Sequence, residues 1–504
     1  MCGILAIFNS NINIELFKDS LKLMNHRGPD FSRIDVFEDT YLGHNRLSIL
    51  DLNPRSNQPF KMGEHVMVFN GEVYNYKELI SQHKLDVKTK SDTEVILLMY
   101  IKYGPKCLHY FNGMFAIIIY NVITKEVFAA RDRLGIKPLY YREKNNEIIF
   151  SSEVSSILKI HPSGIDEFGL RQYKKLRMTL NEYTFYKDIK MFLPGYYYLN
   201  GKMSKYWELD METKKQPSDD EIHWLIKDSI RLRKRSDVSI GSYLSGGLDS
   251  TILTAVVKPD HTWTVGFETL NEFEWSEIAN ERVQSIHHQT IVDNNEFILT
   301  AKKLIHKRKE PLSVPNEVLI YLMTKNVKKH NTVILSGEGA DELFLGYDRI
   351  FRWANHINNI NINEFDEKYS YGSHKDDEVI DYALEGLSGN SSFQKICYFF
   401  QIHHLHGLLR RLDNSTMMCS VEARVPFVDH RLIELISGTP FDWRMGNRIK
   451  DPLKRIFKYI IPEEIIMRKK VGFPVPLESV FVKKDSRMTP MDAWLDFNIK
   501  QMGL

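Results

Sequence analysis

The sequence predicts a protein of two unlike parts, a β-rich α+β part followed by an α/β part with a parallel sheet. Three observations lead to this prediction. Short apolar runs separated by turn residues recur up to about Trp207, a pattern typical of a sheet-built domain. The polar segment from Asp210 to Asp220 has the composition of a linker. Beyond it, strand-like apolar runs alternate with helical patterns, which indicates a parallel sheet.

Composition excludes several classes of protein. The chain has 504 residues, of which 43% are hydrophobic and 26% charged, so a sizeable core is available and a disordered or fibrous chain is excluded. The formal net charge of +2 gives no sign of a nucleic-acid or membrane partner. We find no apolar run long enough to span a bilayer, and we expect no signal peptide. Only 4 cysteines occur, so we expect a reducing compartment and a cytoplasmic protein.

Apolar patterns place the elements of the first part. Strands are expected at Gly3 to Phe8, Val66 to Phe69, Phe115 to Tyr120, Glu147 to Phe150 and Tyr196 to Leu199. Apolar residues at helical spacing predict helices over Phe17 to Met24 and Asp92 to Tyr103. Ser91 is expected to cap the second of these helices, and Glu94 stands where a capping box would place it.

The second part alternates helices and strands. Helices are expected at Glu221 to Arg233, Ser250 to Val257, Trp275 to His287 and Val318 to His330. Strands are expected at Val238 to Leu244, Thr262 to Phe267 and Thr332 to Leu335. We therefore expect one domain over residues 1–206 and a second over residues 207–504, with a linker around residues 210–220.

Cys2 follows the initiator methionine directly. If Met1 is removed, the thiol and the α-amino group belong to one residue. The α-amino pKa is about 7.7–8.0, so this group can act as the base for the thiol without a catalytic histidine. A cysteine at this position by chance is the alternative interpretation.

The surroundings of Cys2 support a nucleophile. In chain order they include Met1 to Ile4, His26 to Asp30, His44 to Asp51, Asn70 to Asn75, Ser91 to Glu94 and Arg131 to Gly135. Together these segments resemble the N-terminal-nucleophile glutaminase domain of class II glutamine amidotransferases. The resemblance implies an αββα sandwich in which Cys2 attacks glutamine and releases ammonia.

The resemblance also assigns roles that suit the chemistry of glutamine. Arg46 would bind the α-carboxylate of glutamine as a bidentate pair, and Glu72 and Asp92 would hold its ammonium group. For Asp92, an acid at a helix N-terminus is the alternative interpretation. Attack on the amide produces an oxyanion that needs hydrogen-bond donors. The Asn70 side chain and the backbone N–H of Gly71 would supply them.

A glycine loop joins a predicted strand to a predicted helix at Leu244-Ser245-Gly246-Gly247-Leu248-Asp249-Ser250. Its backbone N–H groups can cradle an anion, but the lysine of a Walker A loop does not occur here. Asp249 beside phosphates requires a bridging cation, which implies Mg²⁺. The loop resembles the pyrophosphate loop of the adenylating ATP pyrophosphatases, which split ATP into AMP and pyrophosphate. A tight strand-to-helix connection is the alternative.

A second loop from Ser336 to Glu342 follows a later strand. In a parallel sheet it would lie beside the first loop, at the carboxyl ends of the strands. The resemblance assigns Asp341 to the metal with Asp249, Ser336 and Gly337 to ATP binding, and Glu338 to the acyl-adenylate. Val265 matches a position where the backbone contacts adenine.

Two downstream segments, Val421 to Asp429 and Arg468 to Phe473, are similar to segments of the glutamine-hydrolysing asparagine synthetases. Lys470 matches a lysine that stabilises charge in that family, although a solvated surface lysine is the alternative. Arg424 is expected to be structural. The family implies ATP-dependent asparagine synthesis from aspartate and glutamine through a β-aspartyl-AMP intermediate, with ATP, Mg²⁺ and small-molecule substrates, and possibly a homodimer.

Two other functions stay open at this point. A related amidotransferase could amidate another carboxylate, in a peptide or a biosynthetic intermediate, and Pro315 to Glu317 would be the segment to inspect. A non-catalytic regulatory module could keep the same fold, although the intact Cys2, Asp249 and Glu338 argue against it. The tail from Leu477 to Leu504 carries no motif that can be assigned.

Overall fold

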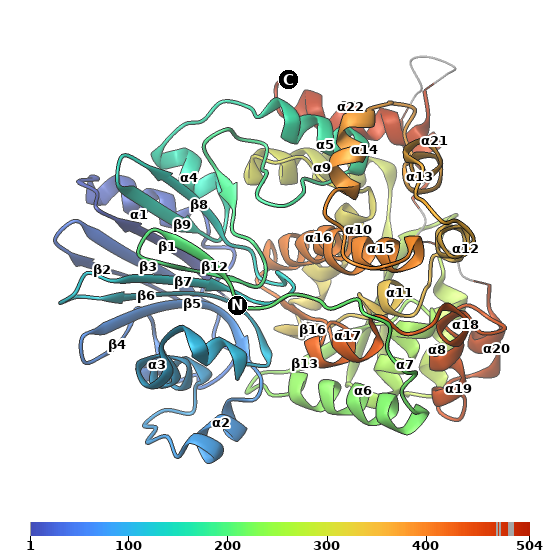
Figure 1. Cartoon of the computed structure of the whole chain (residues 1–504), viewed down its shortest axis with the longest axis horizontal. Helices are drawn as coiled ribbons and strands as arrows, with labels where there is room; N and C mark the ends of the chain where they lie inside the picture. Colours follow the sequence, from blue (N-terminus) through green and yellow to red (C-terminus); the bar gives the residue numbers. More distant parts are fainter. Residues whose placement is uncertain (1, 470–471, 473–474, 482–487) are drawn as a thin grey trace.

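Two six-stranded antiparallel sheets build the N-terminal part of the chain (Figure 1). A computed structural model describes residues 2–469, 472, 475–481 and 488–504. In sheet order, the first sheet contains β10 (Lys190–Met191), β8 (Tyr140–Lys144), β9 (Glu147–Ser151), β1 (Gly3–Phe8), β3 (Thr40–Arg46) and β2 (Phe31–Phe37). The second contains β12 (Lys202–Lys205), β11 (Tyr196–Leu199), β7 (Val127–Arg131), β6 (Gly113–Asn121), β5 (His65–Val73) and β4 (Phe60–Met62).

The alternation of side chains along each strand creates three apolar layers. On β1, Ile4, Ala6 and Phe8 pack between the two sheets, while Leu5 and Ile7 face the opposite side. Helices α1 (Ile14–Lys22) and α4 (Val154–Ile160) pack beside the first sheet, and α2 (Tyr76–His83) and α3 (Asp92–Tyr103) beside the second. The αββα sandwich is therefore confirmed.

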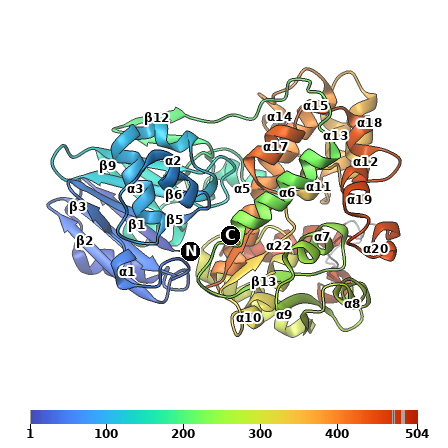
Figure 2. The same cartoon turned by 90° about the horizontal axis from the view of Figure 1, so that it is seen from below.

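A five-stranded parallel sheet forms the centre of the second part (Figure 2). Its order is β15 (Ile286–Val292), β14 (His261–Phe267), β13 (Ile240–Tyr243), β16 (Val333–Leu335) and β17 (Glu422–Arg424). Five helices lie between β12 and β16 in the chain: α6 (Asp219–Arg233), α7 (Leu248–Val257), α8 (Phe273–Glu281), α9 (Asn294–Arg308) and α10 (Asn316–Val327). The predicted α/β parallel sheet is confirmed.

The remaining helices surround this sheet and the junction between the two parts (Figure 1). They are α5 (Glu167–Leu176), α11 (Ala340–Leu343), α12 (Asp348–His356), α13 (Ile362–Tyr369), α14 (Asp377–Leu384), α15 (Ser392–Tyr398), α16 (Leu405–Met417), α17 (His430–Ile436), α18 (Phe441–Met445), α19 (Asp451–Phe457), α20 (Glu463–Met467), α21 (Leu477–Val480) and α22 (Pro490–Gln501). Helix α16 packs against α10 and β17. Within the described residues, no helix combines the length and apolar character needed to cross a membrane.

The C-terminal tail is part of the fold, although its sequence carries no assignable motif. Helix α22 begins in a capping box formed by Thr489 and Asp492, which satisfies the first backbone N–H groups of the helix. Trp494 is fully buried, and α22 packs against α9.

Two expectations about individual elements differ from the structure. The helix expected over Trp275 to His287 ends at Glu281, and its last residues belong to β15. Ser91 caps α3 by accepting the N–H of Thr93, but the predicted capping box is wrong. The Glu94 carboxylate instead accepts backbone N–H groups of Lys88 and Thr89, outside the helix.

Candidate active sites

A small cavity of about 30 Å³ lies beside the start of β1. Its walls include five predicted residues, namely Cys2, Arg46, Gly71, Glu72 and Asp92. Cys2 directly precedes β1, and the other residues come from β3, β5 and the first turn of α3. The fold thus brings together chemical groups that are separated by up to 90 positions in the sequence.

Asn70 and Gly71 present hydrogen-bond donors next to Cys2. The backbone N–H of Cys2 donates to Asn70 Oδ1 at 3.0 Å, and the buried Asn70 Nδ2 has no partner among the described residues. A buried unpaired donor is costly, so this amide is available to an oxyanion. Gly71 has φ +153, and a Cβ there would lie 2.0 Å from the carbonyl oxygen of Met114. Only glycine fits this position.

The Cys2 thiol needs a base. Burial raises its pKa, and the backbone at Leu47 and the Arg46 charge only partly oppose this effect. A buried thiol is a weak nucleophile until it is deprotonated. Removal of Met1, which lies outside the described residues, would free the α-amino group of Cys2 itself for this task.

Two carboxylates face the same cavity. Burial raises the pKa of Asp92 to about 6, and one of its oxygens accepts the N–H of Val73 at 2.8 Å. Burial and the charges of Asp92 and Glu422 raise the pKa of Glu72 well above its usual range. Buried carboxylates that repel one another favour the binding of a cation between them, and the ammonium group of an amino acid meets this requirement.

Arg46 is fixed by the loop that follows it. Its guanidinium donates to the carbonyl oxygens of Leu50, Asp51 and Asn53 and to Asn57 Oδ1, at 2.6–3.2 Å. These bonds hold one cationic wall of the cavity, opposite in charge to Glu72 and Asp92. The cavity therefore offers a cation and two anions, the complement of a zwitterionic amino acid.

A second, larger pocket of about 550 Å³ lies at the carboxyl ends of β13, β14 and β16. Its lining includes ten predicted residues: Leu244, Ser245, Gly247, Asp249, Ser250, Val265, Ser336, Gly337, Glu338 and Asp341. Gly246 supports the loop from behind, since it has φ +69 and a Cβ there would meet the Trp275 backbone at 2.3 Å. Lys470 lies outside the described residues.

Asp249 and Asp341 converge on a lysine that sequence reasoning missed. Lys450 Nζ lies 2.5 Å from Asp341 Oδ1 and also contacts Asp249 Oδ2. Burial alone would lower the pKa of Lys450, but the two carboxylates more than offset this effect and raise the pKa above its ordinary value. Both aspartates thus reach one cation at once. The position carries no recognisable motif, so only the fold could reveal it.

The same two aspartates could provide only some of the ligands that Mg²⁺ needs. Among the described residues, no cluster of three or more His, Cys, Asp and Glu side chains is arranged to hold a metal. Mg²⁺ commonly takes one or two carboxylates and completes its shell with phosphates and water. Asp249 and Asp341 supply the two carboxylates of that pattern.

Glu338 is held by a second residue that sequence reasoning missed. Arg411 on α16 places Nη2 2.5 Å from Glu338 Oε1 and donates through Nη1 to Asn316 Oδ1 at 3.1 Å. All three residues line the large pocket. Glu317, one residue further, instead turns away to pair with Arg308. Of the segment suggested for acceptor recognition, Pro315 and Asn316 therefore reach the pocket.

Comparison with known proteins assigns both parts of the chain. A glutamine amidotransferase domain family matches residues 1–207, and the asparagine synthase family matches residues 221–489. Asparagine synthetase [glutamine-hydrolyzing] 1 of Bacillus subtilis is 30% identical over 95% of this chain and 87% of its own length. Asparagine synthetase 3 of the same organism is 28% identical over 94% and 87%, and asparagine synthetase B of Escherichia coli is 26% identical over 94% and 82%.

The two family matches lie on the two parts that carry the two cavities, one with a terminal cysteine and one with a glycine loop. The synthase match alone covers more than half of the chain. The chain belongs to the family of glutamine-hydrolysing asparagine synthetases.

Proposed function

We propose that this protein makes asparagine from aspartate, glutamine and ATP, with glutamate, AMP and pyrophosphate as the other products. We place the glutaminase domain at residues 1–206 and the synthetase domain at residues 207–504. The observation that carries this proposal is the coexistence, in one chain, of the Cys2 cavity and the Asp249–Asp341 pocket, each with the polar groups its reaction needs.

In the glutaminase domain, Cys2 attacks the side-chain amide of glutamine. Arg46 binds the α-carboxylate of glutamine, and Glu72 and Asp92 bind its ammonium group. Asn70 Nδ2 and the Gly71 N–H stabilise the oxyanion. Collapse of this intermediate releases ammonia and leaves a γ-glutamyl thioester, which water then hydrolyses to glutamate and the free thiol.

In the synthetase domain, the β-carboxylate of aspartate attacks the α-phosphorus of ATP. This step forms β-aspartyl-AMP and expels pyrophosphate. The backbone N–H groups of the Ser245–Ser250 loop and the N-terminus of α7 hold the phosphates. This phosphate-binding site is shaped by Leu244, Gly246, Gly247, Ser336 and Gly337. The backbone at Val265 contacts the adenine.

Ammonia then attacks the activated carbonyl and releases asparagine and AMP. Glu338 takes up the proton lost by the ammonia nitrogen, and Arg411 holds Glu338 in place for this transfer. Lys470 neutralises charge that develops on the reacting phosphate. Asp249 and Asp341 would hold Mg²⁺, which would supply charge neutralisation for the phosphates.

An isotope experiment tests the whole proposal. The pure protein is incubated with MgATP, amide-¹⁵N glutamine and aspartate, and the labelled product is identified by mass spectrometry. Labelled asparagine together with AMP and pyrophosphate is the expected result. Labelled ammonia alone would support the glutaminase activity and would mean that the second site activates a carboxylate other than that of aspartate. A cytoplasmic location and a homodimer belong to the same proposal, and light scattering measures the second.

A further inference from the structure

The glutamine cavity is not built by the N-terminal part alone. Glu72 lies near the end of β5, and Arg424 ends β17 of the parallel sheet. Arg424 Nη2 lies 3.5 Å from Glu72 Oε1, and their side chains are 0% and 6% exposed. An ion pair between the two parts of the chain therefore reaches the wall of the cavity that holds Cys2.

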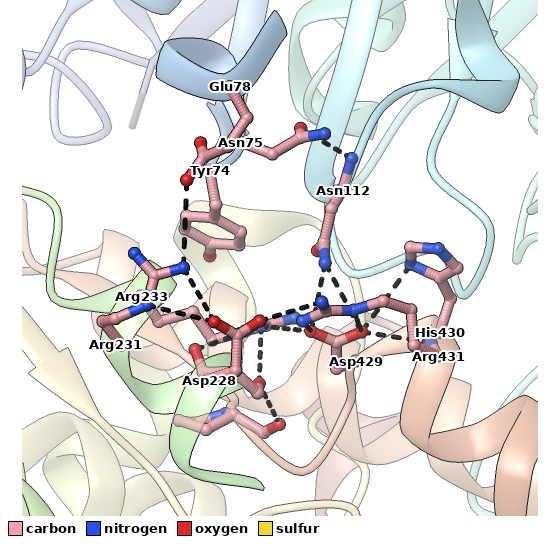
Figure 3. Close-up of polar contacts among 12 residues, drawn as sticks. Tyr74, Asn75, Glu78, Asn112, Asp228, Arg231, Arg233, Asp429, His430 and Arg431 are labelled. Carbon is pink, nitrogen blue, oxygen red and sulfur yellow. Dashed lines mark hydrogen bonds and ion pairs between the residues drawn. The ribbon is translucent and has the colours of Figure 1, made fainter. Parts of the chain in front are cut away.

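Neighbouring contacts fix this end of β5 against the second part (Figure 3). The guanidinium of Arg233 lies over the ring of Tyr74 at 4.8 Å, and that of Arg424 at 5.5 Å. Asn112 donates to Asp429 Oδ2 at 3.2 Å. Such buried polar contacts leave little freedom, so the direction in which Glu72 points depends on residues of the second part.

Arg424 is itself held on its remaining sides. Its Nε donates to Glu422 Oε1 at 2.5 Å, and its Nη1 donates to the carbonyl oxygens of Arg233 and Arg235 at 2.8 and 2.6 Å. The guanidinium fork is rigid and planar, so these bonds determine where Nη2 lies. That remaining nitrogen is the one that approaches Glu72.

The charges around Glu72 show what Arg424 does there. Burial and the charges of Asp92 on α3 and Glu422 on β17 oppose the ionised form of Glu72, whereas Arg424 favours it. Without Arg424, Glu72 would lose its ion-pair partner while the charges of Asp92 and Glu422 continued to act on it. Glu72 would then take up a proton more readily, and a protonated acid no longer attracts an ammonium group.

We propose that Arg424, supplied by the synthetase domain, is a positioning residue for glutamine that favours the charged form of the Glu72 carboxylate and aims it at the ammonium group of the substrate. Arg424 acts through Glu72 and does not touch the reacting amide. This inference rests on the proposed glutaminase function and adds that the glutaminase site is incomplete without a residue of the synthetase domain.

The test is the pH profile of kcat/KM for glutamine hydrolysis, followed by glutamate release in the absence of ATP. In Arg424→Met the acid limb is expected to move to higher pH by about one unit, which is about a tenfold loss below it, with KM rising more than kcat falls. Arg424→Lys restores part of this loss. Glu422→Gln removes an opposing charge, so its limb moves to lower pH.

Arg235→Met is the matched control. Arg235 also joins the two parts, through ion pairing with Glu78 and a hydrogen bond to the carbonyl oxygen of Tyr74, but it does not contact Glu72. Its acid limb is expected to coincide with that of the native enzyme. A limb that moves equally in this control and in Arg424→Met would mean that Arg424 only holds the two parts together.

Two further outcomes decide the matter. A melting curve shows whether each variant folds. If Arg424→Met does not fold, the test rests on the acid limbs of the other two variants, which are expected to move to lower pH in Glu422→Gln and to higher pH in Arg424→Lys. Shifts of the same sign in both, or an unshifted limb in a folded Arg424→Met, would overturn the inference. A native protein that releases no glutamate would instead refute the proposed glutaminase function.

Discussion

Lys450 Nζ lies 2.5 Å from Asp341 Oδ1 and contacts Asp249 as well, so a side-chain ammonium stands where two predicted metal ligands meet. The arrival of MgATP brings a cation for the aspartates and phosphates for the lysine. We therefore expect Lys450 to exchange the two carboxylates for the phosphates when the nucleotide binds.

Lys450→Met should lower asparagine synthesis by about 10- to 100-fold, with either glutamine or ammonia as nitrogen source. A lost charge-assisted contact of about 1.5–3 kcal/mol, together with a vacated charge site, supports this magnitude. Glutamine hydrolysis should persist. The variant should also bind Mn²⁺ without nucleotide more tightly than the native protein, because the competing ammonium is gone. Equal Mn²⁺ affinity in the two proteins would contradict the exchange.

Cys2→Ala removes the nucleophile and leaves the second pocket untouched. We expect glutamine-dependent synthesis to disappear, while synthesis from ammonium salts stays largely intact. Asparagine formation measured with each nitrogen source checks this. Cys107→Ala is a suitable control because Cys107 is also buried but lies in the apolar cluster around α3. If Cys2→Ala lost both activities, the division of labour between the two domains would be wrong.

Asp249→Asn keeps the size of the side chain and removes its charge. We expect Mg²⁺-dependent release of pyrophosphate to be lost, because one of the two carboxylates that would hold the cation is neutralised. Glutamate release should continue at its native rate, which also shows that the variant is folded. A variant that released pyrophosphate normally would remove Asp249 from the metal site.

The sequence predicted best those elements whose pattern is local. Strands β1 and β11 and helix α3 have the predicted bounds, because a clear apolar run or a capped helical pattern sets each one. Strand β3 was missed. Its seven residues are all buried, and they include His44, Asn45 and Arg46, so no alternation of polar and apolar residues marks it.

The candidate site residues could be predicted from the sequence because each belongs to a compact motif, such as the glycine loop before α7. Lys450 and Arg411 belong to no such motif, and the segment that contains Arg424 does not reveal its contact with Glu72. Each acts on a residue that is far away in the sequence. Arg424 was expected to be structural, and its contact with Glu72 spans the junction of two domains. Pairings of this kind arise only when the chain folds.

The raised pKa of Asp92, about 6 because of burial, predicts how glutamine capture depends on pH. The ionised carboxylate binds the ammonium group of glutamine, so binding is retained above the pKa and lost as the pH falls through it. The acid limb of kcat/KM for glutamine should therefore lie at or above pH 6, well above that of an ordinary aspartate. Glu72, whose pKa the Asp92 charge helps to raise, contributes to the same limb.

Asp92→Asn removes one member of this pair. We expect KM for glutamine to rise by about 10- to 100-fold, the equivalent of one charge-assisted hydrogen bond, and the remaining limb to shift to lower pH because Glu72 loses a repelling neighbour. Ammonia-dependent synthesis, compared at a fixed concentration of unprotonated ammonia, should lack this limb. If it showed the same limb, the titrating group would lie in the synthetase domain, and Asp92 would serve only as the first residue of α3.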